Sequence, residues 1–88
     1  MSSKPTIANA GNVVVPAYLA LRGKGYSVHR ERHSDGREET WLAENGSIRV
    51  IAEDPVALLG LVAMAESRGN DWKASDQQIE TFLKEFES

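Results

Sequence analysis

Cysteine is absent from this 88-residue chain, and aromatic residues make up only 7% of it. Without cysteine the protein has no means of forming a disulfide, a thiolate metal site or a cysteine nucleophile. The sequence also lacks an apolar run near the roughly 20 residues that a membrane-spanning helix needs. A signal peptide is not expected, because the apolar stretch follows the small residues Ala8-Asn9-Ala10 instead of preceding them. These absences predict a cytoplasmic protein with no membrane contact.

Length and charge indicate one small domain with two electrostatically different halves. A chain this short buries only about 60–65% of the surface of its unfolded form, so its margin of stability is thin. The net charge of −3 divides into six Lys/Arg and two Asp/Glu in residues 1–37, and four Lys/Arg and eleven Asp/Glu in residues 38–88. A basic half is typical of proteins with an anionic partner, and equally of solvated strands and turns. We expect residues 1–10 to form a flexible tail and residues 11–88 to form one α+β domain.

Two dipeptides, Asp35-Gly36 and Asn45-Gly46, predict a three-stranded antiparallel meander. Both pairs are favoured in two-residue hairpin turns, whose central positions need positive φ. The strands are expected near residues 26–33, 38–44 and 47–53.

The register that these turns impose collects most apolar strand residues on one face. Its rows are Val28, Ala43, Ile48; then Arg30, Trp41, Val50; then Arg32, Glu39, Ala52. The rows of the opposite face are His29, Leu42, Arg49; then Glu31, Thr40, Ile51. A slip by one residue would exchange the two faces, so the agreement between the two turns supports this alignment.

Helices are expected before and after the meander, in the order α-β-β-β-α-α. The first covers about residues 13–22, with Asn12 as its N-cap and Pro16 in its first turn, or it begins near Pro16 itself. The second begins at Asp54-Pro55 and ends near Gly69. It is apolar on most sides, which predicts burial on most sides.

A third helix is expected after Ser75, which forms a capping-box pattern with Gln78. Its apolar residues are spaced i, i+3, i+4, i+7 and form a single stripe. They are Ile79, Phe82, Leu83 and Phe86. We expect this helix and the first to lie beside the second on the inner sheet face, with Trp72 at one edge of the core.

No constellation of residues points to catalysis, a metal or a cofactor. His29 and His33 would lie about 13 Å apart on a continuous strand, too far for one metal ion with ligands about 2 Å away. A nucleophile needs a base oriented by a third group, and nothing in the sequence fixes such a triad. An enzyme that used either histidine would need a carboxylate beside the ring in a concave pocket.

The outer sheet face is the predicted functional surface, because it has apolar residues within a charged rim. We predict a small noncatalytic protein-interaction module, such as an inhibitor, an immunity-like factor or a regulatory factor. Its partner-binding residues would be His29, Glu31, Thr40, Leu42, Arg49 and Ile51. The same pattern also fits an ordinary solvated sheet, and a homodimer through this face or a sheet edge is a further interpretation.

Nucleic-acid binding through the basic first half is the alternative. Arg22, Lys24 and Arg37, with Tyr26 for stacking, would contact a single strand. The element order over residues 13–68 also resembles that of double-stranded-RNA-binding domains. Those domains place basic residues at the N-terminal end of the last helix, whereas the matching helix here begins Asp54-Pro55-Val56-Ala57-Leu58. Without those phosphate contacts the resemblance does not extend to RNA binding.

Overall fold

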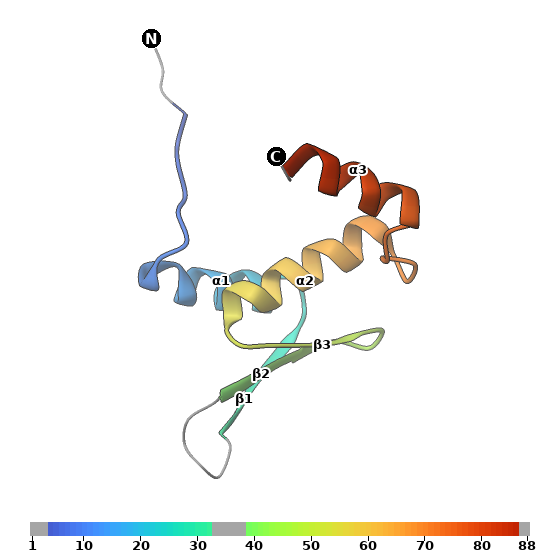
Figure 1. The fold of residues 1–88 in the computed structure, drawn as a ribbon. Coiled ribbons are helices and arrows are strands. Elements are labelled where there is room, and N and C mark those ends of the chain that lie inside the picture. Colours follow the sequence, from blue (N-terminus) through green and yellow to red (C-terminus); the bar gives the residue numbers. More distant parts are fainter. Residues whose placement is uncertain (1–3, 33–38, 87–88) are drawn as a thin grey trace.

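The computed structural model describes residues 4–32 and 39–86, and it has the predicted order of elements (Figure 1). A 3₁₀ turn at Gly11–Val13 leads into helix α1, Val14–Gly23. The strands are β1 (Ser27–Arg32), β2 (Glu39–Glu44) and β3 (Arg49–Ala52), and the later helices are α2 (Pro55–Arg68) and α3 (Asp76–Phe86). The sheet is an antiparallel meander in the order β1-β2-β3, which confirms the α+β prediction.

The first hairpin has the predicted register. Arg30 pairs with Trp41, and the pairing continues without interruption along both strands. The Asp35-Gly36 turn, from which this register is predicted, lies outside the described residues.

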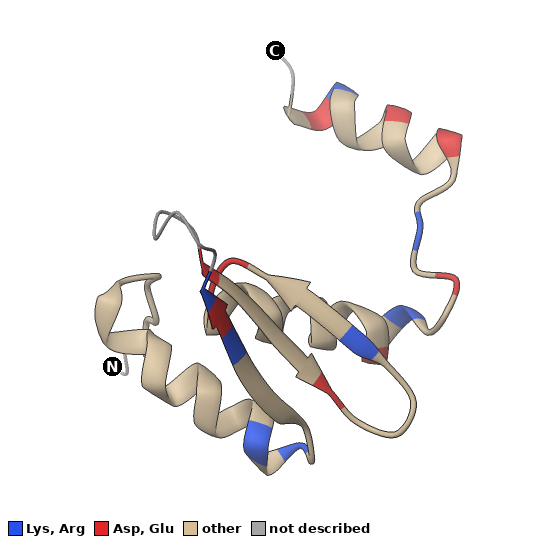
Figure 2. Cartoon of the chain, turned by 90° about the horizontal axis from the view of Figure 1, so that it is seen from below, with Lys and Arg blue, Asp and Glu red and all other residues tan. Residues whose placement is uncertain are grey.

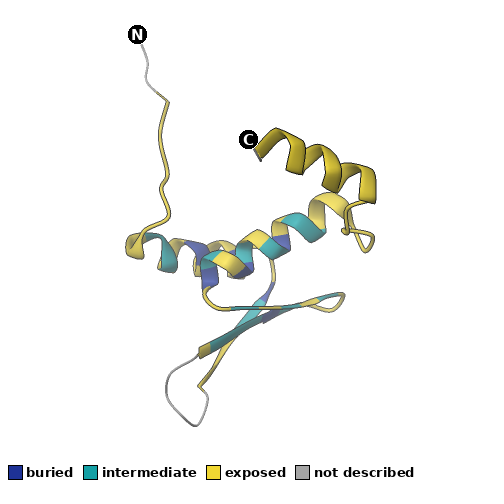
Figure 3. Ribbon diagram, in the orientation of Figure 1, coloured by how far each residue is buried: buried dark blue, intermediate teal, exposed yellow. Residues whose placement is uncertain are grey.

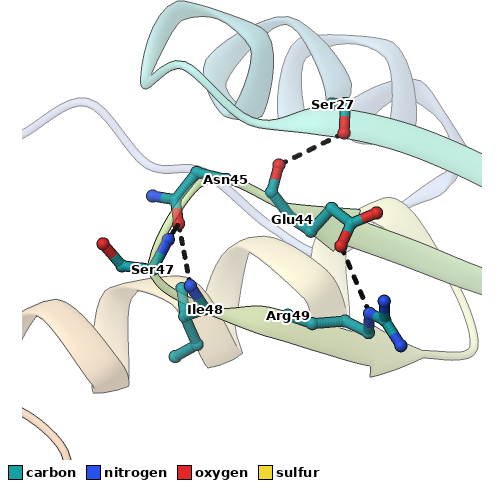
Figure 4. Close-up of polar contacts among 6 residues, drawn as sticks. All are labelled: Ser27, Glu44, Asn45, Ser47, Ile48 and Arg49. Atoms are coloured by element: carbon teal, nitrogen blue, oxygen red, sulfur yellow. Dashed lines mark hydrogen bonds and ion pairs between the residues drawn. The ribbon is translucent and has the colours of Figure 1, made fainter.

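The second hairpin turns one residue later than predicted, at Gly46-Ser47. The N–H of Asn45 donates to the carbonyl oxygen of Ile48 at 3.0 Å, so hydrogen bonding between the two arms continues one residue beyond β2. Its Oδ1 accepts the N–H groups of Ser47 and Ile48 at 2.8 and 2.9 Å (Figure 4). Gly46 does not have positive φ. An Asn side chain that bonds to the backbone ahead of it favours this type of turn over the primed turn that Asn-Gly predicts.

This later turn shifts the β2–β3 register by two residues. Ala43 pairs with Val50 instead of Ile48, and Trp41 pairs with Ala52 instead of Val50. Because the shift is even, every side chain stays on its predicted face. The β3 member of each predicted row is therefore wrong, while the β1–β2 pairings and the predicted faces are confirmed.

The core lies between the inner sheet face and the helices α1 and α2 (Figure 3). Its buried residues are Leu21, Tyr26, Ala43, Leu58 and Val62. The partly buried residues packed against them are Val28, Trp41, Ile48, Val50, Ala52 and Leu59. The predicted inner face thus lies beneath the two helices, as the alternating pattern of the strands requires.

Helix α1 begins without a side-chain cap, so the assignment of Asn12 as N-cap is wrong. Asn12 lies in the 3₁₀ turn, where the N–H of Val13 donates to the carbonyl oxygen of Ala10 at 3.1 Å. The N-cap position falls on Val13. Pro16 lies in the first turn, as predicted, where its missing N–H costs little.

Helix α2 begins and ends as its sequence predicts. Asp54 Oδ1 accepts the N–H of Ala57 at 2.7 Å, and Pro55 occupies the first helical position. Gly69 ends the helix with φ of 74°, a conformation that glycine adopts without strain. The apolar residues that nearly encircle the helix are buried or half-buried, and the exposed small residues Ala57, Gly60 and Ala63 lie along one side of it.

Gly60, in the middle of α2, has no packing role. A Cβ built at Gly60 would meet no atom within 4 Å, so close approach of another backbone does not explain the glycine. Gly60→Ala is therefore expected to raise the free energy of unfolding by about 0.5–1 kcal/mol, because alanine loses less backbone entropy on folding. Urea denaturation measures this change. Gly69→Ala is the control and should be destabilising, and a loss of stability in Gly60→Ala would contradict the open surroundings.

Helix α3 has the predicted cap but does not join the core. The N–H of Ser75 donates to Gln78 Oε1 at 2.9 Å, and the N–H of Gln78 donates to Ser75 Oγ at 3.1 Å. No residue of α3 is buried, and Figures 1 and 3 show it standing off α2. The predicted packing of this helix on the sheet is wrong.

The connection between α2 and α3 is hydrogen-bonded to the end of α2. Arg68 Nε donates to the carbonyl oxygen of Trp72 at 2.8 Å, and Arg68 Nη2 donates to that of Lys73 at 3.3 Å. These bonds direct the chain past the end of α2. Trp72 was predicted to lie at one edge of the core. It is instead 44% exposed beside Lys73. In the described part of the chain, every helix is too short or too polar to cross a membrane.

Candidate protein-binding site

The outer face of the sheet is open along the described strands. Figure 2 views this face, and the sheet lies in front of α2. Its central row runs from His29 through Leu42 to Ile51, because Leu42 pairs with both neighbours. The predicted rows placed Arg49 beside Leu42 and Ile51 beside Thr40. The two-residue shift of β3 thus brings the two largest apolar side chains of this face together.

All six predicted partner-binding residues share this face, since alternate residues of a strand point to the same side. Their exposure differs by position. Leu42 and Thr40, on the central strand, are half-buried, whereas Ile51, on the edge strand, is 55% exposed. His29, Glu31 and Arg49 are the exposed polar members of the set.

An apolar pair therefore forms the centre of the face. Cross-strand neighbours have Cβ atoms about 4.5–5.5 Å apart, so Leu42 and Ile51 make one continuous surface. Both lie on paired strands, and their backbone is already ordered before any partner arrives. Such preorganisation lowers the entropy lost on binding.

A charged rim flanks this pair at one end of the sheet. Arg49 Nε lies 3.3 Å from Glu44 Oε2, and Ser27 Oγ donates to the carbonyl oxygen of Glu44 at 3.2 Å (Figure 4). An exposed ion pair of this kind stabilises a fold by only about 0–1 kcal/mol. Arg49 is therefore able to turn towards an acidic group of a partner at little cost.

The alternative basic set does not form a stacking platform in the described structure. Tyr26 is 3% exposed and belongs to the core, so its ring offers no face to a base. Arg22 Nη1 donates to the carbonyl oxygen of Tyr26 at 3.4 Å. Lys24 Nζ lies 2.8 Å from Glu66 Oε1, and Arg37 lies outside the described residues.

The Lys24–Glu66 pair ties the end of α1 to α2. The hydrogen bond that Lys24 donates to Glu66, and secondarily the charge of Glu66, raises the pKa of Lys24. Because the pKa of Lys24 is higher in the folded than in the unfolded protein, this pair contributes its full stabilisation below the ordinary lysine pKa of about 10.4. It is lost as the pH rises through the folded value.

The arginines of β1 also have local partners. Arg32 Nε lies 3.6 Å from Glu39 Oε1, and Arg30 Nη1 lies 3.9 Å from the same oxygen. The Arg30 guanidinium carbon lies 5.6 Å from the centre of the Trp41 ring. Most of the positive charge near the sheet is therefore paired locally instead of forming a basic patch.

The described residues offer no group of three His, Asp or Glu side chains placed to hold a metal ion. His29 is exposed on the open sheet face, and His33 lies outside the described residues. A cleft of about 390 Å³ lies between residues 7–9, α1 and the start of α2. Its lining residues include no titratable side chain, so this cleft has no group for acid–base chemistry.

Most of the exposed large apolar side chains lie outside the predicted site. Four of them belong to α3, whose stripe is visible in the sequence but was expected to join the core. Helical spacing predicts that a stripe will be covered, but it does not say by what.

Comparison of the chain with protein-family models, with curated proteins and with solved structures found no match. The chain's own surfaces therefore carry the functional inference.

Proposed function

We propose that this protein is a small noncatalytic interaction module, of the inhibitor, immunity-like or regulatory kind, that binds another protein through the outer sheet face. The observation that supports this proposal is the Leu42–Ile51 pair at the centre of an open, preordered sheet. Protein interfaces combine an apolar centre with a polar rim, and this face has both.

The rim defines the chemistry of a suitable partner. Arg49 and His29 lie on the same face as the apolar pair, and Glu31 follows His29 along β1. A partner that places an apolar side chain over Leu42 and Ile51 would match this face best with an acidic group near Arg49 and a basic group near Glu31. Such charge matching mainly sets the association rate and the specificity.

Paired substitutions test the surface. Tagged wild-type protein identifies a partner by mass spectrometry, and calorimetry with the purified partner then measures affinity. Leu42→Asp and Ile51→Asp should each weaken binding by at least about 30-fold, because central interface residues contribute about 2 kcal/mol or more. Ser47→Asp adds the same charge to an exposed position in the adjacent turn and should bind normally. Circular dichroism checks that each variant is folded.

The proposal fails if both variants stay folded and bind the partner with unchanged affinity. Nucleic-acid binding is tested separately with short RNA and DNA at about 50 mM salt, where release of counterions favours association. If the protein binds these RNA or DNA strands, and if Arg22→Glu loses this binding while Ile51→Asp retains it, the partner is a nucleic acid instead of a protein.

A further inference from the structure

The chain exposes more surface than a compact protein of its mass. Its accessible area is 7333 Å², whereas a compact 9.7 kDa monomer exposes about 5,100 Å². Its radius of gyration over Cα atoms is 16.1 Å, against about 12 Å for a compact 88-residue domain. Figure 1 shows why, because the N-terminal segment and α3 both project from the body.

The projecting helix α3 carries an uncovered apolar stripe. Its four large apolar residues are between 43% and 67% exposed, and they are Ile79, Phe82, Leu83 and Phe86. The Phe82 and Phe86 rings pack on each other with centroids 4.9 Å apart, which leaves them together as one aromatic surface in water. Covering such side chains contributes about 1.5–3 kcal/mol each when burial is complete.

A second uncovered stripe lies on the outer side of α1. Val15 and Leu19 are 64% and 59% exposed, and Tyr18 is exposed beside them. With Arg22 these residues follow the spacing i, i+3, i+4, i+7, which is also the spacing of the α3 stripe. Two helix faces of equal length and equal period are suited to pack along each other.

The two helices also differ in charge. The residues of α1 and its C-cap include no acid and two cations, Arg22 and Lys24, of which Lys24 is already paired with Glu66. Helix α3 contains three acids and one lysine, and they are Asp76, Glu80, Glu85 and Lys84. Packing α3 against α1 brings opposite charges together, whereas packing two α3 helices against each other brings like charges together.

We propose that the protein is a homodimer in which α3 of each copy packs its apolar stripe on the outer face of α1 of the other copy. The arrangement is two-fold symmetric, so the α1–α3 contact occurs twice. Stable interfaces bury about 1,200–2,000 Å² in total. Each chain exposes about 2,200 Å² beyond a compact monomer, shared between the N-terminal segment and α3. The interface needs about 600–1,000 Å² of this from each copy.

The difference in charge between the two helices favours a second copy as the occupant. Arg68 donates hydrogen bonds to the connection that leads to α3, and α3 stands off its own α2. The stripe is thereby presented outwards. This proposal is independent of the proposed function, because the outer sheet face stays open in such a dimer.

Sedimentation equilibrium of the full chain, at about 10–100 µM, tests the proposal. The wild-type protein should have twice the monomer mass of 9.7 kDa. Phe82→Glu and Val15→Glu should each raise the dimer dissociation constant at least about 100-fold, since each substitution alters both copies of the contact. Thr81→Glu is the matched control. It places the same charge on the opposite side of α3 and should leave the dimer intact.

Mixing the two monomeric variants distinguishes this arrangement from others. In a mixture of Phe82→Glu and Val15→Glu, one α1–α3 contact has two wild-type faces, so a mixed dimer should form. No mixed dimer would form if two α3 helices packed together, and Val15→Glu would then remain dimeric. The proposal is overturned if the wild-type chain is monomeric throughout this concentration range. The stripe of α3 would then be covered by its own domain or by another protein.

Discussion

Ala43→Asp is expected to unfold this protein or to lower its free energy of unfolding by at least about 3 kcal/mol, because it leaves an uncompensated charge in the core. Ala43 is fully buried on the inner face of the central strand, between Val28 and Val50. No described cation faces this position from the core cluster, whose members are all apolar or aromatic. The chain is small, so the loss is a large fraction of its total stability.

Ile51→Asp is the matched control for this prediction. It introduces the same charge on the other face, where the side chain is more than half exposed. Its fold should persist with a loss of about 1 kcal/mol or less, which is the range of strand propensities. Urea denaturation followed by circular dichroism measures both variants. Equal losses for the two would show that the faces of the sheet are wrongly assigned.

The instability of Ala43→Asp should also depend on pH. Burial raises the pKa of the introduced carboxyl, since the ionised form is the costly one. The full destabilisation relative to wild type is therefore present above the raised pKa of the carboxyl in the folded variant. It shrinks as the pH falls from that pKa towards the unfolded value of about 3.9, because the carboxyl becomes protonated. The measurement is the difference in free energy of unfolding between wild type and Ala43→Asp from pH 8 to about pH 4, a range that covers the pKa of a shifted carboxyl. A constant difference over this range would contradict burial of this position.

Leu58→Ala should lower the free energy of unfolding by about 2–5 kcal/mol, because it removes buried methyl groups and leaves a cavity. Leu58 is fully buried on α2, and it shares the core with Leu21 and Val62. The helix itself should survive the change, since alanine is a better helix former than leucine. The loss is thus due to packing between α2 and the sheet.

Leu61→Ala, on the same helix, is the comparison for Leu58→Ala. Leu61 is half-buried, so the same substitution should cost less than half as much. Thermal unfolding gives the two midpoints in one experiment. A larger loss in Leu61→Ala would mean that α2 turns a different side to the sheet.

Short-range patterns were sufficient to predict where the later helices begin. Asp54 caps α2 through the N–H of Ala57, and Ser75 exchanges hydrogen bonds with Gln78 at the start of α3. Each of these interactions joins residues three positions apart. Their geometry is therefore fixed once the first turn of the helix forms, whatever the rest of the chain does.

The predictions of the second hairpin turn and of the first residue of α1 failed because two local conformations compete at each position. Asn45 was expected at a central turn position, but its side chain instead accepts two backbone N–H groups and moves the turn along by one residue. Asn12 is equally able to cap a helix, but a 3₁₀ turn precedes α1 at this point. Sequence identifies both residues as turn or cap formers and does not rank the alternatives.

The candidate site was predictable in its membership but not in its arrangement. The alternation of side chains along a strand places Leu42 and Ile51 on the same face for any even register. Whether they are neighbours depends on the turn, which brings them into one row with His29. Whether the face is open depends on where the helices pack, and that is a property of the whole chain.

The sequence by itself determined the elements, the two sheet faces, both ends of α2 and the start of α3, because these depend on contacts within a few residues or on a period of two or 3.6. Only the tertiary structure decided that α1 and α2 cover one face of the sheet and that α3 remains apart from it. The physical reason is that an apolar stripe lowers its free energy equally well against any apolar surface. The spacing of Ile79, Phe82, Leu83 and Phe86 therefore requires a partner without identifying it.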